Sequence, residues 1–254
     1  MKPLVSIITP AFNAVDVVWQ AIESVQSQTF LTWEMIIVDD CSTDNTCAVV
    51  KRYAASDSRI RLISQVENRG PAFARNVALS VAEGRYIAFL DCDDLWLSKK
   101  LELQLDFMEK NGFAISYTLY RRFTGDSEHP GRIVPLRQSF DYRSLLMNTG
   151  IACLTVIVDR KLTGYFEMPL VRHEDYALWL KLLRKGFVAH CLQLDLARYR
   201  VAQASVSGNK LKSASWVWNI YRNVEKLSFF NASFCFVGYA WNAYKKRFLS
   251  SKKL

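Results

Sequence analysis

The sequence predicts an α/β protein built on a mostly parallel central sheet that is flanked by helices. Short apolar runs alternate with amphipathic, helix-like stretches through the first 125 residues, and the connections between them are short. This alternation is typical of β-α-β units, in which the strands pair in parallel and the helices cover the sheet. In addition, polar or acidic residues follow several of the apolar runs. In such sheets, ligands bind beyond the carboxyl ends of the strands.

Each element follows from its local pattern. A short continuous apolar run predicts a strand covered on both faces, and apolar residues three or four apart predict a helix with one buried face. Pro10 is expected to end the first strand, and Pro71 is expected in the first turn of a helix. In chain order, the expected strands are residues 5–9, 35–38, 60–63, 86–90, 114–120 and 154–158. The expected helices are residues 15–28, 43–54, 71–82, 97–110 and 175–185.

The composition indicates a folded body with a basic end. The 254 residues are 50% hydrophobic and 22% charged, which excludes a disordered, collagen-like or coiled-coil chain. The formal net charge is +9, and residues 208–254 carry nine Lys/Arg against one acid, Glu225, so the body is nearly neutral. Only this basic tail favours nucleic-acid binding, so that function is the least favoured of those considered. Six cysteines without a CxxC pair indicate reduced thiols.

The acidic cluster after the fourth expected strand is the strongest functional signal. Asp91, Asp93 and Asp94 lie within four residues, and their charges repel one another unless a cation neutralises them. Carboxylate oxygens in a compact turn suit Mg²⁺ or Mn²⁺. A helix N-cap cluster is the structural alternative. The position after a buried strand, together with a second acid pair after another strand, favours the metal site.

Three further groups are candidates for the same site. Asp40 follows the second strand, where it could cap a helix or bind a nucleotide. Gly70 precedes a helix that carries Arg75, so free amides and a guanidinium could both meet a phosphate, although a surface arginine is usually only solvated. Asp175 ends an acid pair at the start of a later helix, where it is either a cap or a general base. The three histidines lack the spacing of zinc ligands.

In this order the groups resemble glycosyltransferase family 2 over residues 3–212. The resemblance is carried by five short segments in register: residues 5–13, 37–44, 70–76, 91–93 and 174–175. It implies a GT-A (nucleotide-diphospho-sugar transferase) fold in residues 1–212. Within it, a nucleotide-binding half would span residues 1–112 and an acceptor half residues 113–212. It also implies an inverting transferase that depends on Mn²⁺ or Mg²⁺.

The resemblance assigns donor binding to six residues near the strand ends: Thr9, Pro10, Asn13, Asp40, Arg75 and Asp91. The first three would line the nucleotide pocket, and Asp40 would contact uracil or ribose. Arg75 would lie near the base and the diphosphate, and Asp91 would face the ribose and the donor sugar.

For the chemistry, the resemblance implies that Asp93 coordinates the metal, that Asp175 is the catalytic base, and that Glu174 supports it. Some members place a histidine near the metal or diphosphate, two residues after the Tyr-Arg that is Tyr199-Arg200 here. This chain has Ala202 at that position, which puts the contact in question. The polar pattern that follows is kept by Ser205 and Ser207.

Residues 213–254 are expected to form a helical, aromatic and basic appendage. Residues 227–244 carry no charge and are rich in aromatics, and Lys245-Lys246-Arg247 follow. Eighteen uncharged residues are the lower limit for a membrane span, and serines, asparagines and a glycine dilute this stretch. An interfacial helix on an anionic membrane surface fits better. The alternative is a helix packed on the body with a solvated basic end.

The expected function is transfer of a hexose from a UDP-sugar to a hydroxyl of a lipid-linked saccharide in bacterial surface polysaccharide (O-antigen, lipopolysaccharide) synthesis. By resemblance, the best specific expectation is β-linked glucose on GlcNAc-diphosphoundecaprenol. The enzyme would work at the cytoplasmic face of the inner membrane as a peripheral protein. Two alternatives stay open: an inactive nucleotide- or glycan-binding module, and a phosphohydrolase with Asp91 as nucleophile. Against the second, the Asp-X-Asp motif ends the fourth strand rather than the first.

Overall fold

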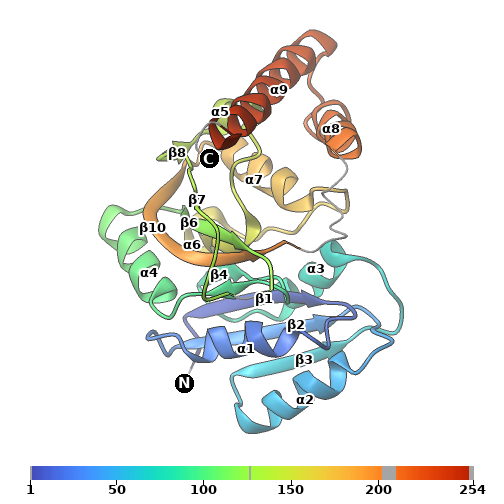
Figure 1. The fold of residues 1–254 in the computed structure, drawn as a ribbon, viewed down its shortest axis with the longest axis vertical. Helices are drawn as coiled ribbons and strands as arrows, with labels where there is room; N and C mark the ends of the chain where they lie inside the picture. The colour runs from blue at the N-terminus through green and yellow to red at the C-terminus, as the bar shows by residue number, and fades with distance from the viewer. Residues whose placement is uncertain (1, 126, 202–209, 252–254) are drawn as a thin grey trace.

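One mixed sheet organises the chain in the computed structural model, which describes residues 2–125, 127–201 and 210–251 (Figure 1). Within these residues its strands are β1 (Val5–Ala11), β2 (Trp33–Asp39), β3 (Ile60–Ser64), β4 (Tyr86–Phe89), β5 (Leu95–Trp96), β6 (Ile115–Phe123), β7 (Ile133–Val134), β8 (Ser139–Phe140), β9 (Ile157–Asp159) and β10 (Ala189–Arg200). Their order is β3-β2-β1-β4-β9-β6-β10-β5, with β7 beside β6 and β8 beside β10.

Helices cover both faces of this sheet. The α-helices are α1 (Val18–Gln26), α2 (Thr46–Ser56), α3 (Pro71–Val81), α4 (Lys100–Asn111), α5 (Tyr142–Leu146), α6 (Arg160–Thr163), α7 (Glu174–Arg184), α8 (Lys210–Asn219) and α9 (Phe229–Ser251). A 3₁₀ turn, η1 (Cys153–Thr155), precedes β9, and a π-helical turn, η3 (Ile220–Val224), follows α8. The helices α1, α2 and α4 pack on one face of the sheet, and α3 and α7 pack on the other.

The strand order creates a switch point between β1 and β4. The chain runs outward from β1 through β2 to β3 and then returns to place β4 on the other side of β1, all in parallel. In open α/β sheets, ligands bind beyond the carboxyl ends of the strands at such a reversal of strand order. The predicted strand-end residues follow β1, β2 and β4 at this edge of the sheet.

The prediction of a mostly parallel sheet holds for β1 to β4 and for the pair β6–β10, but β9 is antiparallel to both β4 and β6. The first strand also runs through Pro10 to Ala11 instead of ending at the proline. The Ile8 carbonyl accepts from Leu90 N–H on the β4 side, so the nitrogen of Pro10, two residues later, faces that same side. Because β4 ends at Phe89, a missing N–H disrupts no strand pairing there.

Three expected helices begin three residues later than predicted, and the first of them, expected over residues 15–28, begins at Val18. The helix expected over residues 43–54 begins at Thr46, since Asp44 accepts the Thr46 amide at 2.9 Å and holds the preceding residues in a turn. The helix expected over residues 97–110 begins at Lys100.

The longest strand among the described residues, β10, was not predicted. Its pairing with β6 is interrupted by two register shifts between Leu192 and Ala197, so its apolar residues do not follow one period.

The C-terminal segment shares the core of the body. Val217, Ile220, Tyr221 and Ala232 are fully buried in the cluster that also contains the apolar face of α7. This is the packing that the alternative interpretation of the tail expected, although α9 also exposes a second apolar face. The division at residue 213 stays a prediction. No helix among the described residues combines the length and the apolarity needed to cross a bilayer.

Candidate active site

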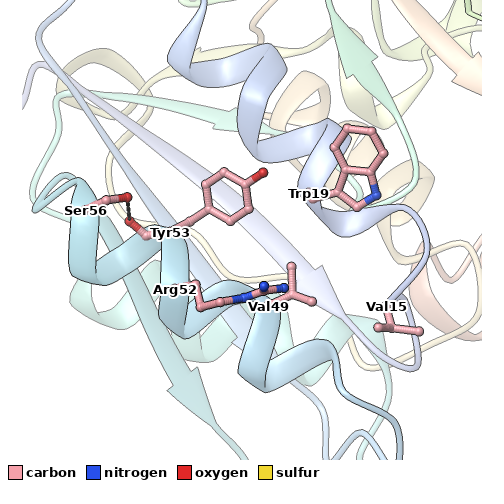
Figure 2. Close-up of a pocket in the computed structure, with 6 residues that line it drawn as sticks. All are labelled: Val15, Trp19, Val49, Arg52, Tyr53 and Ser56. Carbon is pink, nitrogen blue, oxygen red and sulfur yellow. Dashed lines mark hydrogen bonds between the residues drawn. The ribbon is translucent and has the colours of Figure 1, made fainter.

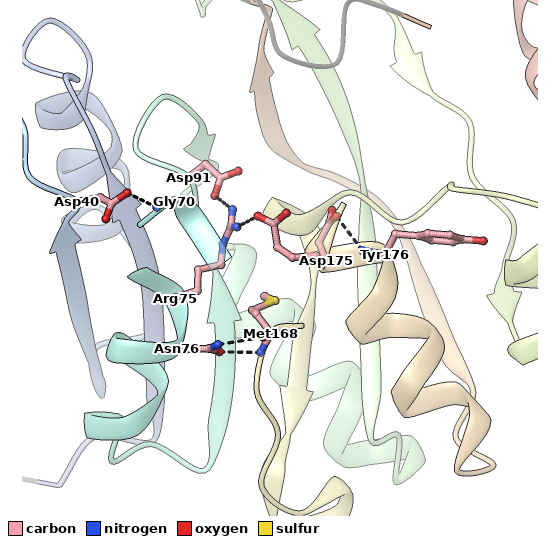
Figure 3. A network of polar contacts seen from close by, with 9 residues as sticks. Asp40, Gly70, Arg75, Asn76, Asp91, Met168, Asp175 and Tyr176 are labelled. Atoms are coloured by element: carbon pink, nitrogen blue, oxygen red, sulfur yellow. Dashed lines mark hydrogen bonds and ion pairs between the residues drawn. The ribbon is translucent and has the colours of Figure 1, made fainter. Parts of the chain in front are cut away.

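Arg75 lies between the acidic turn after β4 and the start of α7 (Figure 3). It projects from the second turn of α3, and its side chain is 6% exposed. One terminal nitrogen, Nη1, donates to Glu174 Oε1 at 2.5 Å, and the other, Nη2, donates to Asp91 Oδ1. The two terminal nitrogens of the buried guanidinium thus each form a charge-assisted hydrogen bond with a different carboxylate. Arg75 therefore links the end of β4 to the start of α7.

The acidic turn after β4 is held by Arg200 from the end of β10. The Arg200 amide donates to Asp94 Oδ1 at 2.8 Å, and its Nε donates to the backbone oxygen of Asp93 at 2.7 Å. Asp94 is buried, and burial together with repulsion from Asp93 and Asp91 raises its pKa well above the usual range. Asp94 is therefore part of the scaffold. The turn leaves the Asp93 carboxylate half-buried beside Asp91.

Asp93 carries the charge that a metal would offset. Burial, and then repulsion from Asp91, raise the pKa of Asp93 to about 6. A divalent cation that also binds phosphate oxygens and water needs only one or two protein carboxylates. The described residues contain no group of three or more His, Cys, Asp or Glu that could form a complete protein cage. The chemistry of Asp93 therefore fits an ion that is shared with a diphosphate.

Asp175 lies in the first turn of α7, next to the Glu174 that pairs with Arg75. His173 begins this helix in the left-handed region, with φ of 57°. Asp175 Oδ1 accepts the Tyr176 amide at 2.8 Å (Figure 3). Burial raises the pKa of Asp175 to about 6, with a further contribution from Glu174, while Arg75 lowers it. A carboxylate with a pKa near 6 suits a general base at neutral pH.

The residues predicted to line the nucleotide pocket lie at different depths. Thr9 is fully buried in β1 with no partner for its hydroxyl, and Pro10 is buried as well. Both residues therefore lie beneath the surface at the carboxyl end of β1. Asn13 is exposed in the left-handed region, and its side-chain oxygen accepts the Thr43 amide at 2.8 Å. Its contact joins the loops that follow β1 and β2.

Asp40 holds the loop before α3. Its carboxylate accepts the Arg69 amide at 2.9 Å and the Gly70 amide at 2.7 Å (Figure 3). Asp40 is 3% exposed, and Asn68 donates to its backbone oxygen at 3.0 Å. The carboxylate thus fixes the turn at Gly70, where φ of 86° suits glycine. A nucleotide contact of Asp40 stays a prediction, as do the roles of the other candidate residues.

Sequence reasoning missed two residues that position this site. Asn76 forms two hydrogen bonds with the backbone of Met168, donating to its oxygen at 2.9 Å and accepting its amide at 2.7 Å. This contact attaches the loop before α7 to α3. The second residue is Arg200, which holds the acidic turn after β4. Ala202, Ser205 and Ser207, which follow it along the chain, lie outside the described residues. A signal for Asn76 was present, since it follows Arg75 directly in the matching segment.

Among the hollows in the described surface, two are candidates for a substrate site. A groove of about 510 Å³ lies between α1 and α2, lined by Val15, Trp19, Val49, Arg52, Tyr53 and Ser56 (Figure 2). It contains none of the candidate residues. A second hollow of about 470 Å³ opens between residues 68–73 and residues 170–174, and Glu174 is in its wall. The second hollow adjoins the Arg75 contacts and is the better candidate for a substrate site.

Comparisons with known proteins match this chain to one family of enzymes. The family Glycosyl transferase family 2 matches residues 6–159. The "Putative teichuronic acid biosynthesis glycosyltransferase TuaG" of Bacillus subtilis (strain 168) is 47% identical over 97% of this chain and 98% of its own. Two Escherichia coli proteins, WfgD and WfaP, are each named "UDP-Glc:alpha-D-GlcNAc-diphosphoundecaprenol beta-1,3-glucosyltransferase". WfgD is 42% identical over 85% of both chains, and WfaP is 41% identical over 87% of this chain and 86% of its own.

Solved structures share the fold. S. aureus TarS 1-349 in complex with UDP-GlcNAc matches 94% of this chain and 72% of its own, with a TM-score of 0.68 and 20% identity. The present chain spans 43% of a longer TarS chain. The mannosyltransferase PcManGT from Pyrobaculum calidifontis, in complex with GDP-Man and Mn²⁺, matches 90% of this chain and 66% of its own, with a TM-score of 0.69 and 19% identity. At this identity the likeness concerns the fold, and the predicted GT-A fold is confirmed.

Proposed function

This chain belongs to glycosyl transferase family 2, and from that membership we propose that it transfers glucose from UDP-glucose to GlcNAc-diphosphoundecaprenol with inversion at the anomeric carbon. The observation that carries the choice of substrates is the shared activity named for WfgD and WfaP, both more than 40% identical over most of their length. Because the acceptor is anchored by a polyprenyl chain, the enzyme would act at a membrane surface as a peripheral protein.

The reaction follows from the two carboxylates with raised pKa. Asp175 takes the proton of the acceptor hydroxyl as that oxygen forms a bond to the anomeric carbon. The bond from that carbon to the β-phosphate oxygen breaks, and UDP leaves with the electron pair. An α-linked donor then gives a β-linkage, which agrees with the β-linkage in the names of WfgD and WfaP. Positioned general-base catalysis contributes about 10²–10⁴ in rate.

The departing diphosphate gathers negative charge next to Asp91 and Asp93. Asp93 would hold a divalent cation, Mn²⁺ or Mg²⁺, which when bound offsets that charge as a Lewis acid. Asp91 would face the ribose and donor sugar while its other contact, to Arg75, keeps it in place. The nucleotide part of the donor would be bound by Thr9, Pro10, Asn13 and Asp40.

The acceptor would approach through the hollow bordered by Glu174. This hollow lies between a loop of the nucleotide half and a loop of the acceptor half, and it carries Arg69 and Arg172 in its wall. Glu174 is fixed by Arg75 and lies next to Asp175 in the sequence, so an acceptor hydroxyl at this end would be close to the base.

The proposal is tested by a panel of donors against one synthetic acceptor. Purified protein is incubated with UDP-glucose, UDP-galactose, UDP-GlcNAc or GDP-mannose and a short-chain GlcNAc-diphospholipid, with and without Mn²⁺, and the product linkage is determined by NMR. We expect β-linked glucose to be transferred from UDP-glucose in the presence of the metal. Transfer of another sugar, an α-linked product, or equal rates after chelation would contradict the proposal.

A second candidate function comes from the 47% identity to TuaG, which extends over nearly the whole length of both chains. A teichuronic acid contains uronic acids, so UDP-glucuronic acid is added to the donor panel. Preference for this donor over UDP-glucose would favour an enzyme of that kind.

A further inference from the structure

Helix α9 has two apolar faces, and the inner one packs against the body of the protein. Ala232 is fully buried and Cys235 is 8% exposed. Asn242 Nδ2 donates to the Met147 backbone oxygen at 2.9 Å, and Gly238 lies so close that a Cβ there would be 2.9 Å from Met147 Cγ. These contacts fix the inner face of α9 on the body next to α5.

The other side of α9 carries a row of large exposed side chains. Phe230, Phe234, Val237 and Trp241, which we call the outer stripe, are 84%, 69%, 68% and 56% exposed. They are spaced four, three and four residues apart, so they lie along one face of the helix. Figure 1 shows α9 at the end of the molecule opposite α2. A contiguous exposed apolar face of this kind marks an interaction site.

The charges around the outer stripe point to its partner. Lys245 lies 5.3 Å from the Trp241 ring, and the sequence continues with Lys246 and Arg247. The one acid of residues 208–254, Glu225, is buried and accepts from Tyr142 and Arg184. The exposed part of the tail therefore combines aromatic rings with positive charge and offers no exposed acid.

We propose that the outer stripe docks on an anionic phospholipid bilayer, with α9 lying in the plane of the membrane surface. Aromatic rings insert at the boundary between headgroups and acyl chains, and lysines bind lipid phosphates. A second copy of the chain fits less well, because its basic residues would add to the positive charge at the same face. The assignment rests on the proposed function, which places the enzyme at a membrane surface, and deepens it by naming the face that binds; the binding itself requires neither the donor nor the acceptor.

Docking through α9 would also orient the active site. Tyr221, at the π-helical turn before α9, contacts the Tyr176 hydroxyl at 3.3 Å, and Tyr176 follows Asp175 on α7. Both tyrosines also donate to backbone oxygens of α5. The surface that meets the membrane and the helix that carries the base are therefore joined by buried contacts.

The test is vesicle flotation of the intact chain without substrates. Phosphatidylcholine vesicles with and without phosphatidylglycerol are mixed with wild-type protein or with the stripe variant Phe230→Ser/Phe234→Ser/Trp241→Ser. A matched control, Leu31→Ser/Val66→Ser/Leu162→Ser, removes three exposed apolar side chains elsewhere. Circular dichroism checks that each variant is folded. We expect wild type and control to float with the anionic vesicles, and the stripe variant to bind at least about tenfold more weakly.

Three results would overturn the assignment. Wild-type protein could fail to float, the stripe variant could float as well as wild type, or neutral vesicles could bind as strongly as anionic ones. Sedimentation of the same samples identifies the rival partner: a dimer that the stripe variant dissociates, without flotation, would assign the face to a second copy. Activity on a short-chain acceptor in solution should be unchanged in the stripe variant. Absence of that activity in the wild type would count against the proposed function and leave the flotation result standing.

Discussion

Two pairs of acids repeat one arrangement around Arg75, one on the proposed nucleotide side of the site and one on the proposed acceptor side. On the nucleotide side, Asp91 pairs with Arg75, and burial and Asp91 raise the pKa of Asp93 to about 6. On the acceptor side, Glu174 pairs with Arg75, and burial and Glu174 raise the pKa of Asp175 to about 6. On each side one acid pairs with the guanidinium, and the neighbouring acid forms no ion pair with it. Under the proposed function, Arg75 therefore positions one acid on each side and leaves the neighbouring acid to take part in the reaction.

The largest expected effect is loss of the reacting acid on the acceptor side. Asp175→Asn keeps the shape of the side chain but removes the base, so we expect turnover to fall at least about a hundredfold. Donor binding should change little. Steady-state kinetics with the short-chain acceptor measure this, and Asp106→Asn, an exposed carboxylate on α4, is the matched control. Near-normal turnover would remove Asp175 from its role.

On the nucleotide side, Asp93→Asn should also lower turnover at least about a hundredfold, since the charge of the leaving diphosphate loses its metal contact. Unlike Asp175→Asn, it should weaken donor binding in the presence of Mn²⁺ and leave binding without metal unchanged. Calorimetric titration of UDP with and without Mn²⁺ separates the two variants. Equal effects of both substitutions on donor binding would break the proposed division of roles.

An intermediate effect is expected when the shared guanidinium is replaced. Arg75→Met leaves two carboxylates without their partner, and breaking a buried ion pair costs about 3–5 kcal/mol of folding stability. Arg75→Lys retains the charge but cannot fork to both acids, so it should be milder. Thermal unfolding measures the loss of stability.

The same variant also tests the charge of Arg75. In Arg75→Met protein that still folds, the fall of activity at low pH should begin at a higher pH than in the wild type, because Arg75 lowers the pKa of Asp175.

The pH dependence of the wild type tests Asp175 as the base. This carboxylate must be ionised to act, so activity should fall as the pH drops through about 6. The residual activity of Asp175→Asn should no longer fall near pH 6, because the variant lacks the carboxyl group with that pKa. Rates measured from pH 5 to pH 8 in buffers of constant ionic strength decide this. A profile that stays flat down to pH 5 would contradict the assignment.

The smallest expected effect concerns stability. Since the pKa of Asp175 in the folded chain, about 6, exceeds its ordinary value of 3.8, the folded state binds the extra proton between these values. Its contribution to stability is therefore lost as the pH rises through this window. Asp175→Asn should raise the melting temperature by several degrees at pH 8, but not at pH 4. Equal shifts at both pH values would show that the gain has another cause.

Much of the nucleotide half could be predicted from the sequence. The βα alternation from Val5 to Asn111 depends on local periodicity, and the structure confirms its strands and helices with shifts of a few residues at their ends. The placement of Asp40 and Asp91 after parallel strands follows from the same pattern. The prediction failed where local period is weak, as in the short strands β5, β7 and β8 and in the bulged strand β10.

The sequence by itself determined which acids lie at the strand ends, because a run of apolar residues reports where a strand is buried and where it stops. Only the tertiary structure decided that Arg75 faces Asp91 and Glu174, which are 16 and 99 residues away along the chain. It also decided that Asn76 holds Met168 and that Tyr221 of the tail reaches Tyr176. The physical reason is that hydrophobic periodicity is read over a few residues, whereas the partner of a buried polar group depends on which distant segment the sheet topology places beside it.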